Sequence, residues 1–336
     1  MRNAIACNRA HSYIPVGAAL SLLLLGVVLA ADNPKPSEVR VSVEPRVSNR
    51  ETAERSSNIR VDSNLVLVPV TVTDRQNRLV TGLDREYFKI FEDRVEQTIT
   101  HFGAEDAPIS VGILLDRSGS MSDKLAKSHQ ALAQFLKTAN SGDEFSLVAF
   151  SDRPELLSGF TGQIEEIQKC LPFIYPGGRT ALLDAVLLMV RQMQLARNQR
   201  KAIIIISDGG DNASHSSIKD IKNLVSEADV QIFAIAITEP VFERKGIFEE
   251  GLGPALLQEL SVQTGGRLFE VNNLNSLPEI ASKIGLALRL QYVLGYAPSS
   301  IANNGKYHKV SVKLAQPVHQ LKLRLSWRLG YYAPSE

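Results

Sequence analysis

The segment PISVGILLDRSGSMSDK, residues 108–124, decides the fold of this 336-residue chain. It begins with a continuous apolar run, which is typical of a strand that is buried on both faces of a parallel sheet. The run ends at Asp116, and the hydroxyls of Ser118 and Ser120 follow at alternate positions. Because ligands bind beyond the carboxyl ends of strands in such sheets, this arrangement predicts a binding site at the end of the strand.

The alternation of apolar runs and helical patterns continues through the middle of the chain. Further short apolar runs have the length of buried strands, and the segments between them carry apolar residues at helical spacing. Strands are expected at 108–116, 145–150, 201–208 and 230–237, and helices at 122–138, 180–195, 217–228, 253–264 and 277–290. This order predicts an α/β domain with a doubly wound, mostly parallel, Rossmann-like sheet covered by helices on both faces.

Both flanks of this region show apolar and polar residues in period two, as expected for antiparallel strands with one solvated face. The alternation is clear at 64–74, 307–315 and 321–332, and Pro69 predicts an edge or a bulge in the first of these strands. Each flank alone offers too few strands for a stable fold. We therefore expect the flanks to pair into one small antiparallel β domain, into which the α/β domain is inserted. Shorter strands are expected near 87–91 and 97–102.

The N-terminus has the order of a secretory signal. Arg2 and Arg9 precede an apolar run at 16–30 that ends in small residues. The run is shorter than the ~20 apolar residues that a spanning helix needs. We expect cleavage after Ala30 or Ala31, no membrane span afterwards, and export to a periplasm, the cell surface or the medium; a retained anchor is the alternative.

The sequence therefore predicts five parts. They are a signal peptide at 1–31, a flexible linker at 32–62 with few large apolar side chains, a β-rich flank at 63–105, the α/β domain at 106–290 and a second β-rich flank at 291–336. The formal net charge is +1, which gives no field that would attract nucleic acid. Basic side chains on the C-terminal strands are accordingly interpreted as a solvated face; they are Lys309, Lys313, Lys322, Arg324 and Arg328.

Oxygen-bearing side chains follow three separate segments of the α/β region. Asp116, Ser118 and Ser120 follow the first strand, Thr180 closes the glycine-rich YPGGRT, and Asp208 ends AIIIISD. Parallel strands bring such loops to one edge of the sheet. Hard oxygen ligands without histidine or cysteine nearby in sequence favour Mg²⁺, with Mn²⁺ or Ca²⁺ as alternatives, over zinc or copper.

This set of residues resembles the metal-ion-dependent adhesion site of von Willebrand factor type A domains. All five positions match, and the resemblance covers about 108–290. The flanks are similar to those of bacterial, acidobacterial-type VWFA-related domain proteins. The resemblance implies a divalent-cation-dependent protein-binding or adhesion module that is not an enzyme, with an Asp or Glu carboxylate of a protein partner completing the coordination.

Two other functions are compatible with the same residues. Asp116 or Ser118 could serve as a nucleophile in a metal-dependent hydrolase or phosphoryl-transfer enzyme, but the sequence shows no evident general base and no P-loop. A scaffold with a vestigial metal site is the third alternative. Asp116, the two serines and Thr180 could also cap helices. Capping would explain one of these residues, but not the presence of five oxygen-bearing residues on three separate loops.

Overall fold

The computed structural model describes residues 65–103, 106–238, 252–298, 305–315 and 322–334. The expected signal peptide and linker lie outside these residues. Within the described part of the chain, no helix is both long enough and apolar enough to cross a membrane.

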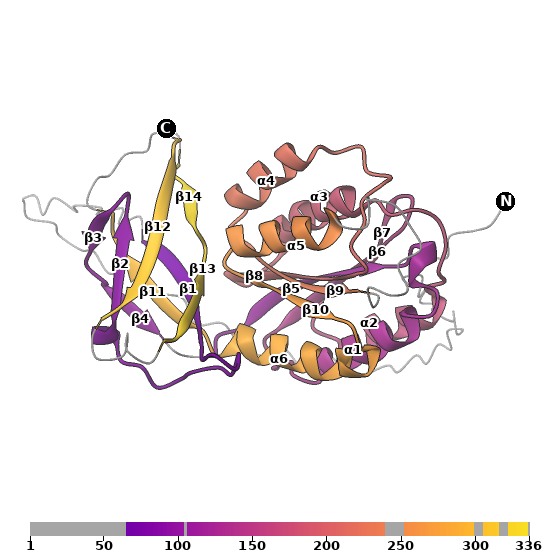
Figure 1. Ribbon diagram of the computed structural model, residues 1–336, viewed down its shortest axis with the longest axis horizontal. Coiled ribbons are helices and arrows are strands. Elements are labelled where there is room, and N and C mark those ends of the chain that lie inside the picture. The colour runs from indigo at the N-terminus through magenta and orange to yellow at the C-terminus, as the bar shows by residue number, and fades with distance from the viewer. Residues whose placement is uncertain (1–64, 104–105, 239–251, 299–304, 316–321, 335–336) are drawn as a thin grey trace, which may run out of the picture. The chain divides into compact units, whose positions relative to one another are not determined.

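A six-stranded sheet in the order β10-β9-β8-β5-β6-β7 forms the centre of the α/β region (Figure 1). Neighbouring strands are parallel except β6 and β7, which are antiparallel. The strands are β5 Ile109–Asp116, β6 Glu144–Phe150, β7 Pro154–Thr161, β8 Arg200–Ser207, β9 Gln231–Ile237 and β10 Arg267–Val271. The predicted doubly wound, mostly parallel sheet is confirmed.

Helices cover both faces of this sheet (Figure 1). Helices α1, α2 and α6 pack on one face, where Ile113 and Leu115 lie, and α3, α4 and α5 pack on the other, where Leu114 lies. Successive residues of β5 therefore enter opposite cores, which explains why its sequence is continuously apolar. The helices are α1 Leu125–Leu136, α2 Ile164–Cys170, α3 Leu182–Gln192, α4 Ile218–Glu227, α5 Leu252–Gln263 and α6 Leu277–Arg289. Short 3₁₀ turns lie at η1 Arg85–Tyr87, η2 Gly119–Met121, η3 Leu171–Phe173, η4 Met193–Leu195 and η5 Leu274–Ser276.

The two flanks form two four-stranded antiparallel sheets with the orders β13-β1-β11-β4 and β14-β12-β2-β3. Strand β1 pairs with β11 and β13, and β2 pairs with β12, so each sheet joins strands from both sides of the α/β region. The sheets share one apolar core. The strands are β1 Val66–Thr73, β2 Phe88–Glu92, β3 Val95–Gln97, β4 His101–Gly103, β11 Tyr292–Tyr296, β12 Tyr307–Leu314, β13 Arg324–Trp327 and β14 Gly330–Tyr332. The inserted topology is confirmed.

Several local expectations differ from the structure. The single strand expected near 97–102 is two strands, β3 and β4, because the chain crosses there from one sheet to the other. Strand β1 is an interior strand, and Pro69 is tolerated because the ladder to β13 begins only at Val70. Strands β7 and β10 and helix α2 were not anticipated. Strand β7 is an edge strand without a fully buried residue, so its sequence has no clear period.

One member of the expected solvated basic face has a different role. Arg328 forms an ion pair with Asp229, and its guanidinium lies 5.5 Å from the ring centroid of Tyr331. Its side chain is 13% exposed, so it is mostly removed from solvent. Lys309, Lys313 and Arg324 are exposed, as expected for the solvated face.

Tyr292 connects the core of the β domain to the segment that follows β1. Its ring is buried and lies 4.9 Å from the Phe88 ring, centroid to centroid. Its hydroxyl donates to the Val80 carbonyl oxygen at 3.1 Å and accepts from the Leu83 backbone N–H at 3.0 Å. One phenol therefore satisfies two backbone groups that regular secondary structure does not pair.

We expect Tyr292→Phe to lower the free energy of unfolding by roughly 1–3 kcal/mol, because it leaves both backbone groups without their partner. Denaturant unfolding measures this loss. Tyr175→Phe is the matched control, since Tyr175 is 67% exposed and should change stability by less than about 0.5 kcal/mol. Equal stability of Tyr292→Phe and the wild type would contradict this interpretation.

Candidate metal centre

Asp116 lies at the carboxyl end of β5, in the middle of the six-stranded sheet, and it is fully buried. Its Oδ1 accepts a hydrogen bond from the Ser118 backbone N–H at 2.8 Å, and its Oδ2 accepts one from the Ser207 hydroxyl at 2.6 Å. Because β5 and β8 are neighbours, the second bond connects the ends of two parallel strands. The carboxylate is therefore held in one orientation.

Ser118 and Ser120 lie on the turn that follows β5. Their hydroxyl oxygens are 3.1 Å apart, with Ser118 buried and Ser120 exposed. Ser118 precedes the short helix η2, but its side chain makes no cap hydrogen bond there. Helix α1 begins only at Leu125, and its start has no side-chain cap. Helix capping therefore does not account for these serines.

Thr180 reaches the same edge from the loop before α3. The Gly178 carbonyl oxygen accepts from the Gly119 N–H at 2.9 Å, which joins this loop to the serine turn. Gly178 has a φ of +84°, and a Cβ there would lie 2.4 Å from an Asp152 carboxylate oxygen, so the turn requires glycine. Thr180 is 5% exposed, and helix α3 begins two residues later without a cap from its side chain.

The loop after β8 carries Asp208 and holds Thr180 in place. The Asn212 side-chain oxygen accepts from the Thr180 N–H, and Asp211 Oδ1 accepts from the Leu182 N–H, both at 2.9 Å. Asp211 thus fixes the start of α3. The Asn212 side chain thereby joins the loop after β8 to the loop before α3.

Helix α5 packs against the loop immediately after Asp208. A Cβ on Gly253 would lie 1.5 Å from the Gly209 carbonyl oxygen, so the two backbones approach as closely as glycine allows. The Gly209 N–H donates to the Ser207 hydroxyl at 3.0 Å. The same serine donates to Asp116, so the Asp208 loop and the central carboxylate share a hydrogen-bonding partner.

Asp208 carries an unexpected partner. The ammonium Nζ of Lys124 lies 3.0 Å from Asp208 Oδ2, and the two side chains are only 7% and 11% exposed. Lys124 belongs to the DRSGSMSDK segment, where the sequence interpretation assigned it no role. Its contact with Asp208 depends on the pairing of β5 with β8, which a single segment does not reveal.

Burial raises the pKa of the Asp116 carboxyl to about 6. The hydrogen bonds from Ser207 and Ser118 favour the ionised form and oppose this effect, whereas the nearby negative charge of Asp208 raises the pKa further. A buried carboxylate beside a second carboxylate is an unfavourable arrangement that a cation relieves.

The donor chemistry fits a small, hard divalent cation. Asp116, Ser118 and Ser120 lie on one turn, the Thr180 loop is hydrogen-bonded to that turn, and Asp208 is close enough to Asp116 to influence its pKa. Carboxylate and hydroxyl oxygens suit Mg²⁺, which keeps several waters and needs few protein ligands. The residues that sequence reasoning did not identify are the supporting ones; they are Lys124, Ser207 and Asn212.

A second group of metal-type side chains lies in the β domain. Glu92, Asp93 and His308 place one donor atom each within 4.8 Å of one another, with His308 Nδ1 2.9 Å from Asp93 Oδ2. The hydroxyls of Tyr296 and Tyr331 donate to Glu92 Oε2 at 2.6 and 3.0 Å. These groups satisfy one another and connect β2 to β12, so we interpret them as a structural network. His308 is far from Glu92 and Asp93 in the sequence, and the pairing of β2 with β12 brings it to them.

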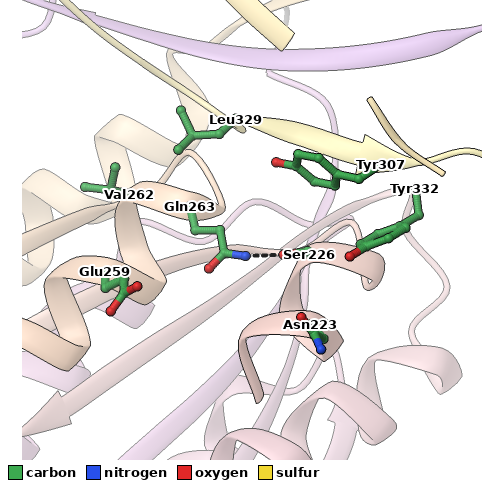
Figure 2. A pocket seen from close by; sticks show the side chains of 8 residues that line it. All are labelled: Asn223, Ser226, Glu259, Val262, Gln263, Tyr307, Leu329 and Tyr332. Atoms are coloured by element: carbon green, nitrogen blue, oxygen red, sulfur yellow. Dashed lines mark hydrogen bonds between the residues drawn. The ribbon is translucent and has the colours of Figure 1, made fainter. Parts of the chain in front are cut away.

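A pocket lies apart from the Asp208 loop (Figure 2). Figure 2 shows Gln263 of α5 hydrogen-bonded to Ser226 of α4, with Tyr307 and Tyr332 nearby. The two tyrosine rings make an edge contact at 5.2 Å between centroids. The pocket uses the C-terminal half of α5, whereas Gly253 at the other end of this helix contacts the Asp208 loop. It is therefore separate from the candidate metal centre.

Comparison with known proteins shows what the α/β region is similar to. Residues 111–210 match the von Willebrand factor type A domain family. Calcium-activated chloride channel regulator 1 from Bos taurus is 31% identical over 188 residues, which cover 52% of this chain and 19% of that protein. Inter-alpha-trypsin inhibitor heavy chain H4 from Bos taurus is 26% identical over 194 residues, with 51% and 20% covered.

A solved structure described as von Willebrand factor type A from Catenulispora acidiphila has 14% identity and a TM-score of 0.47, covering 81% of this chain and 74% of that one. The chain spans between 19% and 55% of the length of the curated relatives that it matches.

In metal-free protein, the raised pKa of Asp116 should make stability fall as the pH rises. The folded state holds this proton up to about pH 6, whereas the unfolded state releases it near the ordinary value of 3.8. The stabilising contribution is thus complete below pH 3.8 and is lost through pH 6. Between pH 5 and pH 7 we expect a loss of about 1 kcal/mol that is absent in Asp116→Asn.

Denaturant unfolding with chelator at both pH values measures this difference. The variant removes the titrating group while it retains a side-chain oxygen that can accept the Ser118 N–H. Identical pH dependence in the wild type and in Asp116→Asn would show that Asp116 does not titrate in this range.

Proposed function

We propose that this chain, whose residues 111–210 match the von Willebrand factor type A domain family, is an exported module that binds a protein partner through a divalent cation. The ion, for which Mg²⁺ is the first candidate, would be held by Asp116, Ser118, Ser120, Thr180 and Asp208. The observation that supports this best is the convergence of two carboxylates and three hydroxyl-bearing residues on three loops that hydrogen-bond to one another.

The charges of this donor set favour binding of an anion by the loaded site. The three hydroxyls are neutral, so two carboxylates at most balance a divalent ion. When bound, Mg²⁺ supplies a coordination position that an incoming carboxylate can occupy in place of water. The residues of this chain fix the geometry beforehand: Ser207 and the Ser118 N–H orient Asp116, and Asn212 holds the Thr180 backbone.

An enzymatic function is the weaker alternative. Asp116 already accepts hydrogen bonds from Ser207 and from the Ser118 backbone, and the sequence has no phosphate-binding P-loop. Turnover of phosphate or acyl esters by the wild type, lost in Asp116→Asn, would favour the hydrolase or phosphoryl-transfer alternative over a binding module.

Asp208→Ala should reduce Mg²⁺ affinity by at least about tenfold, because it removes one of two anionic ligands that neutral hydroxyls do not replace. The fold should be retained with lowered stability, since Asp208 lies in a loop outside the apolar cores but its loss deprives the buried Lys124 ammonium of this carboxylate. Calorimetric titration with Mg²⁺ measures the affinity, and circular dichroism checks the fold.

Asp123→Ala is the matched control. It removes one carboxylate from the exposed surface of the same segment that carries the serines, and it should leave the affinity within about threefold. Equal losses of Mg²⁺ affinity in both variants would show that overall charge alone causes the effect. An unchanged affinity in Asp208→Ala would exclude Asp208 as a ligand.

Peptides selected on the wild-type protein in Mg²⁺ should carry an Asp or Glu on which binding depends. Replacing that residue by its amide should weaken binding by at least tenfold, or about 1.4 kcal/mol, because the amide lacks the charge that attracts the ion. Chelator should have a comparable effect, and binding should return with Mg²⁺ or Mn²⁺. Fluorescence anisotropy measures each affinity.

Thr180→Ala tests whether those peptides bind at the proposed centre. It removes one hydroxyl, so peptide affinity should fall, whereas Tyr332→Phe, at the separate pocket, should leave it unchanged. Peptides that are indifferent to chelator and to Thr180 would bind elsewhere, and the proposed mechanism would then be wrong.

A further inference from the structure

Lys124 holds a positive charge inside the group of residues proposed to bind a cation. Its Nζ donates to Asp208 Oδ2 at 3.0 Å, with 7% and 11% of the two side chains exposed. A buried ammonium beside a carboxylate is screened far less by salt than a surface pair is. Salt therefore screens little of the effect of its charge on anything that Asp208 binds.

The backbone around Lys124 is fixed on both sides. Its N–H donates to the Met121 carbonyl oxygen at 3.0 Å, and its own carbonyl oxygen accepts from the Ser128 N–H at 3.0 Å and from the Ser128 hydroxyl at 3.1 Å. Met121 ends the short helix that contains Ser120, and Ser128 lies in α1. The backbone of Lys124 is thus anchored both to the serine turn and to α1.

The charge balance of the site changes once Lys124 is included. Asp116 and Asp208 contribute two negative charges when ionised, and Lys124 contributes one positive charge. These three side chains together then carry −1, instead of the −2 of the two carboxylates alone. A divalent ion in their midst would leave an excess of one positive charge, which a partner carboxylate can neutralise.

We infer that Lys124 is a built-in counter-charge of the candidate metal centre: it weakens the hold of the site on the cation and strengthens the attraction of the loaded site for a carboxylate. This inference rests on the proposed function. Mg²⁺ or Mn²⁺ must compete with the ammonium for Asp208, so affinity for the ion is lowered. The bound ion, being less neutralised, attracts an anionic oxygen more strongly.

The test compares the metal affinity of Lys124 variants. Lys124→Met retains much of the apolar side chain but removes the charge, and Lys124→Arg keeps the charge. Lys127→Met is the matched control, because it removes the same charge from the partly exposed surface of α1. Calorimetric titration with Mn²⁺ should show at least tenfold tighter binding to Lys124→Met, and affinities within threefold of the wild type for Lys124→Arg and Lys127→Met.

A second measurement tests how strongly the metal-loaded site binds a carboxylate. Acetate is titrated into each Mn²⁺-loaded protein, and displacement of metal-bound water is followed by water-proton relaxation. Acetate should bind Lys124→Met at least threefold more weakly than the wild type. A purely structural ion pair would lower the unfolding midpoint in chelator without producing these opposite changes in ion and acetate affinity.

The outcomes separate this inference from the proposed function. Mn²⁺ affinity that is unchanged or weaker in Lys124→Met, with normal binding by the wild type, would overturn the role of Lys124 alone. Absence of Mn²⁺ binding in both proteins would overturn both. Binding by Lys124→Met but not by the wild type would support the counter-charge and overturn metal-dependent binding by the natural chain. If Lys124→Met does not fold, Lys124→Gln replaces it with a neutral hydrogen-bond donor.

Discussion

The buried carboxylate of Asp116 is the constraint on which the rest of the α/β region depends. A charged group at the end of a fully buried strand is stable only if its oxygens are satisfied, and here the Ser118 N–H and the Ser207 hydroxyl do so. Because these donors come from different loops, satisfying one carboxylate also aligns the loops after β5 and β8. The edge of the sheet is organised around this requirement.

The other loops at this edge are positioned by backbone contacts that need small residues. Gly178 allows its carbonyl to reach the Gly119 N–H, and Gly253 allows the start of α5 to approach Gly209. Side chains at these positions would push the loops apart, so the donors of separate segments would no longer converge. Binding chemistry here depends on packing as much as on the polar residues themselves.

In the β domain, the constraint is the burial of apolar sheet faces. Strands β1 to β4 come from one side of the insertion, and β11 to β14 from the other. Neither group could bury its apolar face alone, whereas together they enclose a core that includes Val68, Ile90 and Leu294. Since β11 follows α6 directly and β4 precedes β5, this closure also holds the two ends of the α/β region close to each other.

The sequence by itself determined the alternation of buried strands and amphipathic helices, the two β-rich flanks and the candidate donors from Asp116 to Asp208. These features depend on periodicity and local motifs, which are properties of neighbouring residues. Only the tertiary structure decided which strands pair, that the chain between residues 97 and 101 changes sheets, and that Lys124 meets Asp208. It likewise decided that Ser207 and Asn212 support the site and that His308 lies beside Glu92. These contacts join residues far apart in the chain, and no local pattern specifies them, since they arise from strand order and from the packing of loops against one another.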